Sequence, residues 1–271
     1  MSGPDTNEAR IISEQLWGPP LDLVEGSGTC REVMGARSGN SLRSLYRFEL
    51  RLGSTTTRLK HPVEAVYYVV SGSVEVSSAT AEGNRTLSTG GMLHVRPFGD
   101  YAMQAQEDAV VIGGPCPVDP DFGRSAADLV TPPEVTDAGV GFFSRDEPGL
   151  MVPFISADAR MVVWYGAGAR TANMNYVVLE PGERNREHQH RYSEDTIFII
   201  DGHGTLEDIT SGRNLPFGPG DTVTIPPGVV HAVNADRGER IVSVGGPCPA
   251  DLDMLRAAGV DVDALTAALL P

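Results

Sequence analysis

The sequence has few cysteines and few basic residues relative to acidic ones, and each scarcity excludes a class of protein. Its three cysteines, Cys30, Cys116 and Cys248, form no CxxC motif and are odd in number. They argue against a disulfide framework and indicate reduced, packed thiols. Lys and Arg total 21 against 36 Asp and Glu, which gives a net charge of −15. This charge disfavours nucleic acid and anionic membrane surfaces as partners.

A signal segment and a long apolar run are also missing. Residues 1–10 lack the charged-then-apolar pattern of a secretory signal. No stretch approaches the roughly 20 apolar residues of a membrane span. We therefore expect a cytoplasmic protein that does not enter a membrane.

Glycine and proline, by contrast, are abundant, with 31 and 20 of the 271 residues. They separate short runs rich in Val, Leu, Tyr and Phe, at residues 41–50, 65–76, 91–97 and 109–115. Short β-forming runs bounded by turn residues are typical of a sandwich or barrel. The sequence thus predicts an all-β fold.

The two halves of the chain repeat each other. At an offset of 129 or 130 residues, Gly53, His61, Gly72, Gly91, Pro97 and Gly99 recur as Gly182, His190, Gly202, Gly220, Pro226 and Gly228. The segment GGPCP at 113–117 also recurs at 245–249. Collinear self-similarity of this kind marks a duplicated domain.

Histidines and carboxylates gather in the second half. His188 and His190 lie two residues apart before a run of β-formers, which places both imidazoles on one face of a strand. Glu194 and Asp195 follow, and His231 comes after a Pro-Pro-Gly turn. A single histidine in a strand is more often packed or exposed. Three imidazoles and a carboxylate converging from separate strands instead indicate a first-row transition-metal site.

These residues resemble the two motifs of the cupin family, whose fold is a jelly-roll β-barrel. The first motif, G-x5-HxH-x3,4-E-x6-G, is met by Gly182, His188, His190 and Gly202. The second, G-x5-PxG-xx-H-x3-N, is met by Gly220, Pro226, Gly228 and His231, with Asn234 one position early.

The carboxylate of the first motif departs from the family pattern. Asp195 stands where the family usually has Glu, and Glu194 lies one residue early. Both neighbours therefore remain candidates for the ligand. Aligning the two halves without a gap puts Ala65, seven residues before Gly72, opposite Asp195. Because a one-residue slip turns a side chain to the other face of a strand, we predict Asp195 as the ligand.

The resemblance and the repeat together predict two tandem cupin jelly-roll barrels with short C-terminal helices. The predicted segments are an N-terminal arm (1–20), a first barrel (21–120), a linker (121–150), a second barrel (151–250) and a helical segment (251–271). The linker includes a candidate short helix at 125–130. The helical segment begins at Asp251 and breaks near Gly259. Its apolar residues are expected to cover a barrel or a dimer seam: Leu252, Leu255, Val260, Leu265 and Leu269.

The first half lacks the metal set. Aligned on the second half, Leu59, Ala65 and Ala102 stand at the positions of His188, Asp195 and His231, and His61 alone survives. One imidazole cannot hold a divalent ion against water. His94 is a further polar candidate there, although an ordinary strand histidine is the more common case. We therefore predict one metal per chain, in the second barrel.

Four protein ligands leave coordination positions open, as catalytic metal sites do. The resemblance implies an enzyme with one divalent transition metal, and Fe(II) is favoured over Mn, Zn, Ni or Cu. The favoured function is an Fe(II) dioxygenase that uses O2 on a small polar or aromatic acid. The alternatives are a redox-neutral Mn or Zn isomerase, decarboxylase or hydrolase, with an architecture like ureidoglycine aminohydrolase, and a non-catalytic small-molecule binder. A homo-oligomer is left open.

Glu194 and Tyr176 are the candidate catalytic residues. Further candidates for the pocket wall lie on the same β-rich runs: Asn175, Ile197, Ile199 and Val223. Arg184 and Arg186 precede the HxH pair and are candidates for attracting an anionic substrate at the mouth, although loop arginines are more often only solvated.

Overall fold

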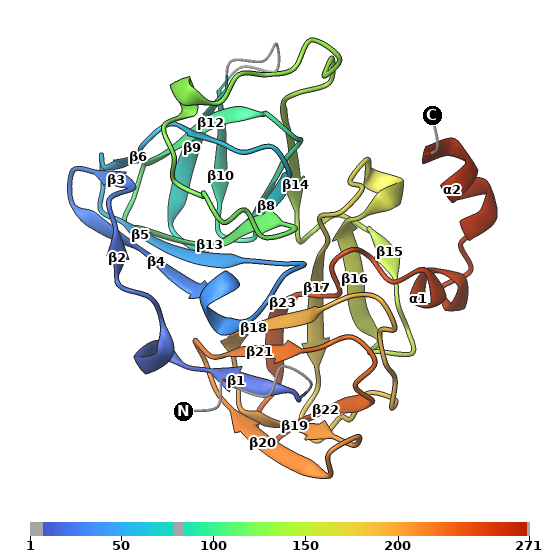
Figure 1. Cartoon of the computed structure of the whole chain (residues 1–271). Helices are drawn as coiled ribbons and strands as arrows, with labels where there is room; N and C mark the ends of the chain where they lie inside the picture. The colour runs from blue at the N-terminus through green and yellow to red at the C-terminus, as the bar shows by residue number, and fades with distance from the viewer. Residues whose placement is uncertain (1–7, 79–83, 270–271) are drawn as a thin grey trace. The chain divides into compact units, whose positions relative to one another are not determined.

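The computed structural model describes residues 8–78 and 84–269 and divides the chain into two compact units. The described parts of Trp17–Glu147 form the first barrel. The second barrel comprises the described parts of Pro148–Pro271 and of Met1–Leu16. Both are built from antiparallel strands, as Figure 1 shows, and the predicted all-β duplication is confirmed.

The first barrel contains two sheets. A seven-stranded sheet has the order β14-β11-β8-β13-β5-β4-β2, and the other sheet has the order β10-β9-β12-β6-β3, with β7 paired to β12. The strand bounds are β2 Pro20–Leu21, β3 Val24–Glu25, β4 Gly28–Met34, β5 Leu45–Leu50, β6 Thr55–Thr56, β7 Leu59–Lys60, β8 Glu64–Ser71, β9 Ser73–Ser78, β10 Arg85–Ser88, β11 Gly91–Val95, β12 Asp100–Ala105, β13 Ala109–Cys116 and β14 Val140–Ser144. Short 3-10 turns lie at Ala36–Ser38 (η2) and Ala126–Asp128 (η3).

The second barrel repeats this plan. Its seven-stranded sheet has the order β1-β21-β18-β23-β17-β16-β15, and its small sheet has the order β20-β19-β22. The strand bounds are β1 Arg10–Ile12, β15 Leu150–Met151, β16 Asp158–Val163, β17 Met174–Leu179, β18 Asp195–Asp201, β19 Gly204–Asp208, β20 Arg213–Phe217, β21 Thr222–Ile225, β22 His231–Ala235 and β23 Ile241–Gly245. The 3-10 turns η1 and η4 lie at Glu14–Leu16 and Tyr165–Ala167.

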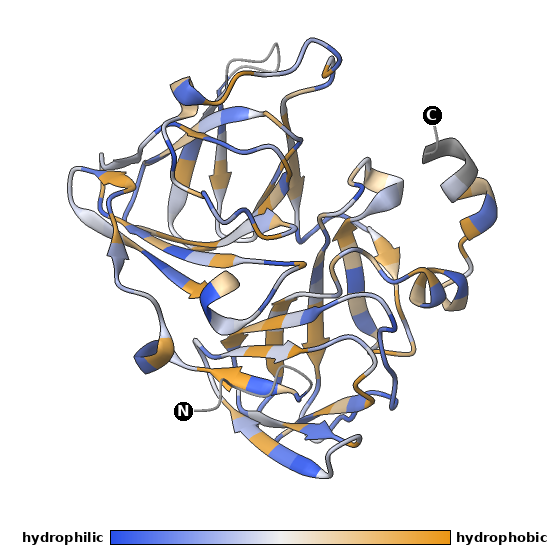
Figure 2. Ribbon diagram, in the orientation of Figure 1, coloured by the Kyte–Doolittle hydropathy of each residue, from blue (hydrophilic) through white to orange (hydrophobic). Residues whose placement is uncertain are grey.

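Alternation along the strands builds each core. On β8, Ala65, Tyr67 and Val69 face the interior of the first barrel, where they join one continuous hydrophobic cluster. On β18, Ile197 and Ile199 do the same in the second barrel. Figure 2 shows hydrophobic and hydrophilic residues alternating along the strands of both units. The interior is therefore a place where a polar side chain needs a partner.

Repeated glycines set the turns between strands. Gly72 and Gly202 occupy matching positions, with φ of 73° and 84°. A Cβ on Gly72 would lie 2.2 Å from the carbonyl oxygen of Asp108, and one on Gly202 would lie 2.0 Å from that of Arg240. Only glycine fits such a turn without moving the neighbouring strand.

The expected arm and the expected linker both contribute strands to the barrels, which the sequence did not predict. The expected linker at 121–150 contains β14, which pairs along its whole length with β11. The expected arm at 1–20 contains β1, which pairs with β21, and the first residue of β2, which pairs with β4. In each case a short run covers the edge of a sheet and satisfies its free backbone groups. The candidate helix at 125–130 is the single 3-10 turn η3.

The C-terminal segment forms the helices α1 (Leu252–Ala257) and α2 (Val262–Leu269), separated at Gly259, where φ is 87°. Four of the predicted apolar residues join a cluster on β15 and β16: Leu252, Leu255, Val260 and Leu265. The side chain of Leu269 lies outside the described residues. Within the described part of the chain, neither helix has the length and apolar character to cross a membrane. All three cysteines are buried, as predicted, and none of them takes part in a disulfide.

Replacing Gly202 by Ala is expected to lower the free energy of unfolding by about 1–3 kcal/mol, because a left-handed backbone is costly for a residue with a Cβ. The clash with Arg240 adds to this loss. Gly238→Ala is the control, since a Cβ there meets nothing within 4 Å. Urea unfolding measures both variants. Equal stabilities for the two would contradict the assigned role of the Gly202 turn.

Candidate metal centre

Three backbone segments bring the predicted ligands together. His188 forms an isolated bridge with His231, with hydrogen bonds of 3.1 and 2.9 Å between their backbones. His190 lies two residues beyond, where its carbonyl accepts a hydrogen bond from Gly228. Asp195 opens β18, and His231 opens β22. The HxH pair therefore lies in an extended segment outside the named strands, held by the His188–His231 bridge and by the hydrogen bond from Gly228.

The four side chains form one cluster. Each offers a ligand atom, and these atoms all lie within 4.8 Å of one another. Asp195 Oδ2 is 3.7 Å from His190 Nε2 and 3.6 Å from His231 Nε2. His190, Asp195 and His231 are buried, whereas His188 is half-buried at the edge of the group. The structure thus brings together the set that the sequence proposed.

Backbone carbonyls orient two of the imidazoles. His188 Nδ1 lies 2.8 Å from the carbonyl oxygen of Arg186, and His231 Nδ1 lies 3.0 Å from that of Val229. A proton on each Nδ1 donates to these carbonyls, which leaves Nε2 with its lone pair turned to the cluster. Metal-binding histidines are held in the same manner.

The charges in the cluster depend strongly on one another. Burial alone would raise the pKa of Asp195, but the adjacent imidazoles of His190 and His231 hold it well below its usual range. Burial would also lower the pKa of His190, yet Asp195 and Asp251 outweigh it and raise that pKa to about 9. Burial and the neighbouring imidazoles lower the pKa of His188 to about 4. The site therefore holds a carboxylate beside at least one neutral imidazole.

Several buried atoms of this cluster have no hydrogen-bond partner. They are His190 Nδ1, His231 Nε2 and Asp195 Oδ1. An unpartnered polar atom in a protein interior is costly, and native structures seldom keep one without a reason. A divalent cation bound by imidazole nitrogens and a carboxylate oxygen meets this requirement. The residues present fit a transition metal.

Glu194 occupies a different place from Asp195. Its backbone forms a bridge with Cys248, and its side chain is buried outside the cluster of ligand atoms. Because adjacent residues of an extended chain point to opposite faces, only one of the two carboxylates can face the histidines. The structure places Asp195 there, in the register that the sequence comparison favoured.

A cavity of about 60 Å³ opens beside the cluster. His188, His190 and Asp195 lie on its wall. The other lining residues are largely apolar: Ile155, Asn175, Val177, Leu179, Asn185, Ile197, Ile199, Val233, Ile241, Ser243, Val244, Gly245, Gly246, Pro247 and Met254. No lysine or arginine is among them, so the histidines of the cluster are the only side chains on this wall that could pair with an anionic group.

Some predicted wall residues do not reach this cavity. Asn175, Ile197 and Ile199 line it as expected. Tyr176 lies between Asn175 and Val177 on β17, and alternation turns it to the opposite face, where Arg160 packs over its ring at 5.3 Å. Val223 belongs to the barrel core and is not on the cavity wall. The structure therefore gives Tyr176 and Glu194 no contact with the cavity.

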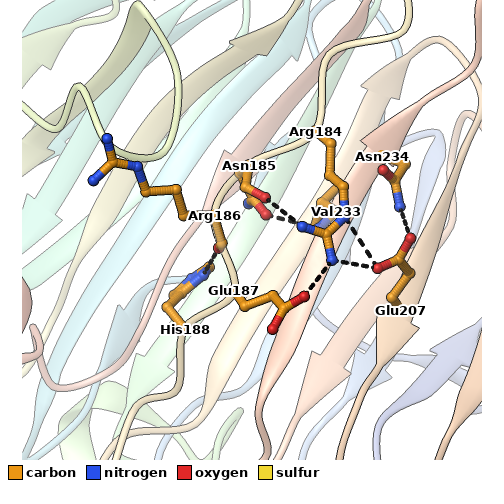
Figure 3. A network of polar contacts seen from close by, with 8 residues as sticks. All are labelled: Arg184, Asn185, Arg186, Glu187, His188, Glu207, Val233 and Asn234. Atoms are coloured by element: carbon orange, nitrogen blue, oxygen red, sulfur yellow. Dashed lines mark hydrogen bonds and ion pairs between the residues drawn. The ribbon is translucent and has the colours of Figure 1, made fainter.

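Arg184, a candidate for attracting an anionic substrate at the mouth of the cavity, is instead paired with two carboxylates. Figure 3 shows its guanidinium between Glu187 and Glu207, at 2.9 and 2.6 Å. Asn234 also donates to Glu207, at 2.6 Å. Arg186 is exposed and points away from this network. The two flanking carboxylates already neutralise Arg184, so we assign it a structural role.

The first barrel contains a different interior at the equivalent place. Leu59 pairs with Tyr101 there, as His188 pairs with His231 in the second barrel. The residue opposite His231 is therefore Tyr101 and not Ala102. The prediction was wrong by one position, because the second barrel has one more residue between its turn glycine and this strand.

Hydrogen bonds provide partners for the polar side chains in the interior of the first barrel. His61 Nδ1 lies 2.7 Å from the carbonyl oxygen of Val63, and its Nε2 lies 3.2 Å from the Tyr101 hydroxyl. Tyr67 and Tyr101 share a 2.5 Å hydrogen bond. Burial lowers the pKa of His61 to about 4, so the ring stays neutral. His94 pairs instead with Glu64, at 3.4 Å. Both ring nitrogens of His61 thus already have hydrogen-bond partners within the first barrel.

Comparisons with known proteins agree with this description. A family profile described as "Cupin domain" matches residues 175–244. A Streptomyces cyaneus protein named polyketide synthase CurC is 33% identical over 64 residues. That match covers 24% of this chain and only 40% of the Streptomyces protein.

Solved structures of Bacillus subtilis oxalate decarboxylase share the fold. One variant gives a TM-score of 0.68 at 15% identity and covers 92% of this chain and 80% of that chain. The structure at pH 4.6 gives 0.66 at 15% identity, with 92% and 79% covered. A structure studied for its Mn(II) centres gives 0.65 at 15% identity, with 92% and 80% covered. The second barrel therefore contains a stretch that matches the cupin domain, and the chain shares the two-barrel fold of these structures, with a candidate metal site in its second barrel.

Asp251 is a residue of this site that the sequence analysis treated only as the start of a helix. Its carboxylate lies 3.5 Å from His190 Nδ1. A signal for it exists in the repeat, because PCPVDPD at 115–121 matches PCPADLD at 247–253. The repeated segment GGPCP ends two residues before Asp119 in the first half and before Asp251 in the second, so it does not itself include this aspartate.

Replacing His231 by Ala is expected to remove most of the bound metal, because three remaining ligands compete poorly with water. Metal analysis after dialysis measures this loss. His203→Ala is the matched control, since His203 is exposed and pairs with Glu239. Full metal content in the His231 variant would exclude His231 from the site.

The carboxylate assignment has its own test. We expect Asp195→Asn to lose metal and Glu194→Gln to retain it, because only Asp195 faces the imidazoles. Metal content and a urea midpoint are measured on both variants, so that unfolding is separated from ligand loss. The reverse pattern of metal loss would contradict the register of β18.

Proposed function

We propose that the second barrel is the active site of a metal-dependent, redox-neutral enzyme, of the decarboxylase, isomerase or hydrolase type. The observation that carries this proposal is the cluster of His188, His190, Asp195 and His231 beside a largely apolar cavity. Four protein ligands leave a coordination position for a substrate atom, as catalytic sites require. The shared fold with oxalate decarboxylase supports this class over the Fe(II) dioxygenase.

The metal is proposed to be Mn(II), with Zn(II) as the alternative. When bound, such an ion supplies a Lewis acid that polarises a substrate oxygen. The support is the donor set, in which nitrogen and oxygen ligands suit both ions, and the Mn(II) centres of the structurally similar oxalate decarboxylase. The three imidazoles and Asp195 would hold the ion, and its protein ligands would carry a single negative charge.

The cavity favours a substrate with an apolar body. Its walls are mostly Ile, Val, Leu and Met side chains, and no lysine or arginine lines it. A small dianion such as oxalate would need a cation beyond the metal to offset its loss of hydration. An aromatic or otherwise apolar acid or ketone needs only one oxygen or a chelating pair at the metal. The polyketide synthase name of the Streptomyces protein is in keeping with such a carbon skeleton.

Residues of the cavity have separate tasks in this proposal. Ile197 and Ile199 exclude water and pack against the substrate. Asn175 presents a buried side-chain oxygen that has no hydrogen-bond partner. This oxygen is placed to accept a hydrogen bond from a substrate hydroxyl. Asn185 is fixed instead, because its side-chain oxygen accepts from the backbone N–H of Val233 at 2.8 Å.

An Fe(II) dioxygenase is the second candidate. It rests on the same open coordination position, which suits O2 as well as a substrate oxygen. A non-catalytic binding protein would use the same apolar cavity without turnover. The three functions differ in two observables, namely product formation and O2 consumption.

We expect the Mn(II)-loaded protein to convert an apolar aromatic or keto acid without consuming O2, and to leave oxalate unchanged. The assay follows CO2 release, product formation and dissolved O2 over a panel of such acids, in air and under strict anaerobiosis. His203→Ala is a control that should behave as the wild type. Turnover that needs O2 would favour the dioxygenase, and binding without turnover by any metal-loaded form would favour the binding protein.

A further inference from the structure

The carboxylate of Asp251 faces two groups at once. Its Oδ1 accepts a hydrogen bond of 2.8 Å from the backbone N–H of Met254, which caps the first turn of α1. Its Oδ2 lies 3.5 Å from His190 Nδ1. Both side chains are nearly inaccessible, with exposed fractions of 4% for His190 and 7% for Asp251. Each oxygen of the carboxylate is therefore directed at one neighbour.

His190 is the one imidazole of the cluster without a backbone acceptor. His188 and His231 each have a carbonyl within 3.0 Å of Nδ1, whereas His190 Nδ1 is buried and has no hydrogen-bond partner. The separation of 3.5 Å is a few tenths of an ångström longer than a normal N–H···O bond. A small approach of either side chain closes it, and Asp251 then supplies the acceptor that the two other histidines find in the backbone.

We propose that Asp251 is a positioning residue that keeps the proton of His190 on Nδ1 and so directs Nε2 to the metal. This role rests on the proposed metal centre. A metal-binding histidine whose other nitrogen donates to a carboxylate is oriented and made more basic. Because the same carboxylate starts α1, and Met254 of α1 lines the cavity, Asp251 also ties this wall of the cavity to the metal ligand.

In the first barrel, the residue equivalent to Asp251 fixes the following turn but does not serve as the acceptor for a histidine. Asp119 holds the equivalent position, and its side chain accepts from the backbone N–H of Asp121 at 3.1 Å and from Arg124 at 2.5 Å. The equivalent histidine, His61, finds its acceptor in the carbonyl of Val63. Fixing the following turn is thus common to both halves. The approach to a histidine without a backbone acceptor belongs to the second barrel.

An asparagine at position 251 can perform only one of the two tasks. Asn is as good a helix cap as Asp, so its oxygen can still accept from Met254. Its NH2 group then faces His190 Nδ1 and donates to it, which moves the imidazole proton to Nε2. If the amide turns over, the oxygen serves His190 but the cap is lost. The substitution therefore separates metal binding from helix stability.

The test compares Asp251→Asn with Asp261→Asn in the full chain. Asp261 is the matched control because it accepts from the backbone N–H of Ala264 at 3.0 Å at the start of α2, away from the metal ligands. Titrations with Zn(II) and with Mn(II) give the metal affinities. The visible absorption of the Co(II)-loaded protein reports the ligand field. Urea unfolding of the metal-free variants reports the helix caps.

We expect Asp251→Asn to weaken metal binding by about 10–100-fold and to alter the Co(II) spectrum. Its unfolding midpoint should stay close to that of Asp261→Asn, whose affinity and spectrum should match the wild type. Wild-type affinity and spectrum in Asp251→Asn would overturn the role of Asp251 and leave the metal centre standing. A wild-type chain that binds neither metal would overturn the metal centre and this role together.

Discussion

The structure of the second barrel depends on the burial of one carboxylate among three imidazoles. Asp195 is 4% exposed, and an ionised carboxylate so far from water costs several kcal/mol unless partners compensate it. The partners come from two segments distant in sequence, the HxH stretch and the start of β22, which the His188–His231 bridge joins. Strand register and the repeated turns therefore serve to bring imidazoles to Asp195.

The first barrel avoids the cost of a buried carboxylate, because the position equivalent to Asp195 holds an uncharged residue. Ala65 replaces the carboxylate, Leu59 replaces one histidine, and Tyr101 replaces another. The hydroxyls of Tyr67 and Tyr101 and the ring of His61 then satisfy one another. The four positions equivalent to the ligands, Leu59, His61, Ala65 and Tyr101, include no anionic group, so a divalent ion gains nothing from them that offsets its lost hydration. Duplication has kept the frame of turns and strands while the two interiors have diverged.

The fold and the cluster of candidate ligands could be predicted because turn glycines and paired histidines leave local signals. Residues whose role depends on a neighbour distant in sequence leave weaker signals in the sequence. Tyr101 was missed because one residue more in the second barrel shifts the alignment after the turn. Tyr176 faces away from the cavity, and Arg184 is held by two carboxylates. Asp251 looked like a helix start only, since its approach to His190, 61 residues earlier in the sequence, exists only in the folded chain.

The most direct test of this account is the anomalous scattering of crystals grown with Mn(II) or Zn(II). We predict one peak per chain, in the second barrel, about 2.0–2.2 Å from Nε2 of His188, His190 and His231 and from an oxygen of Asp195. A peak in the first barrel beside His61, or a metal bound away from the second-barrel cluster, would contradict it.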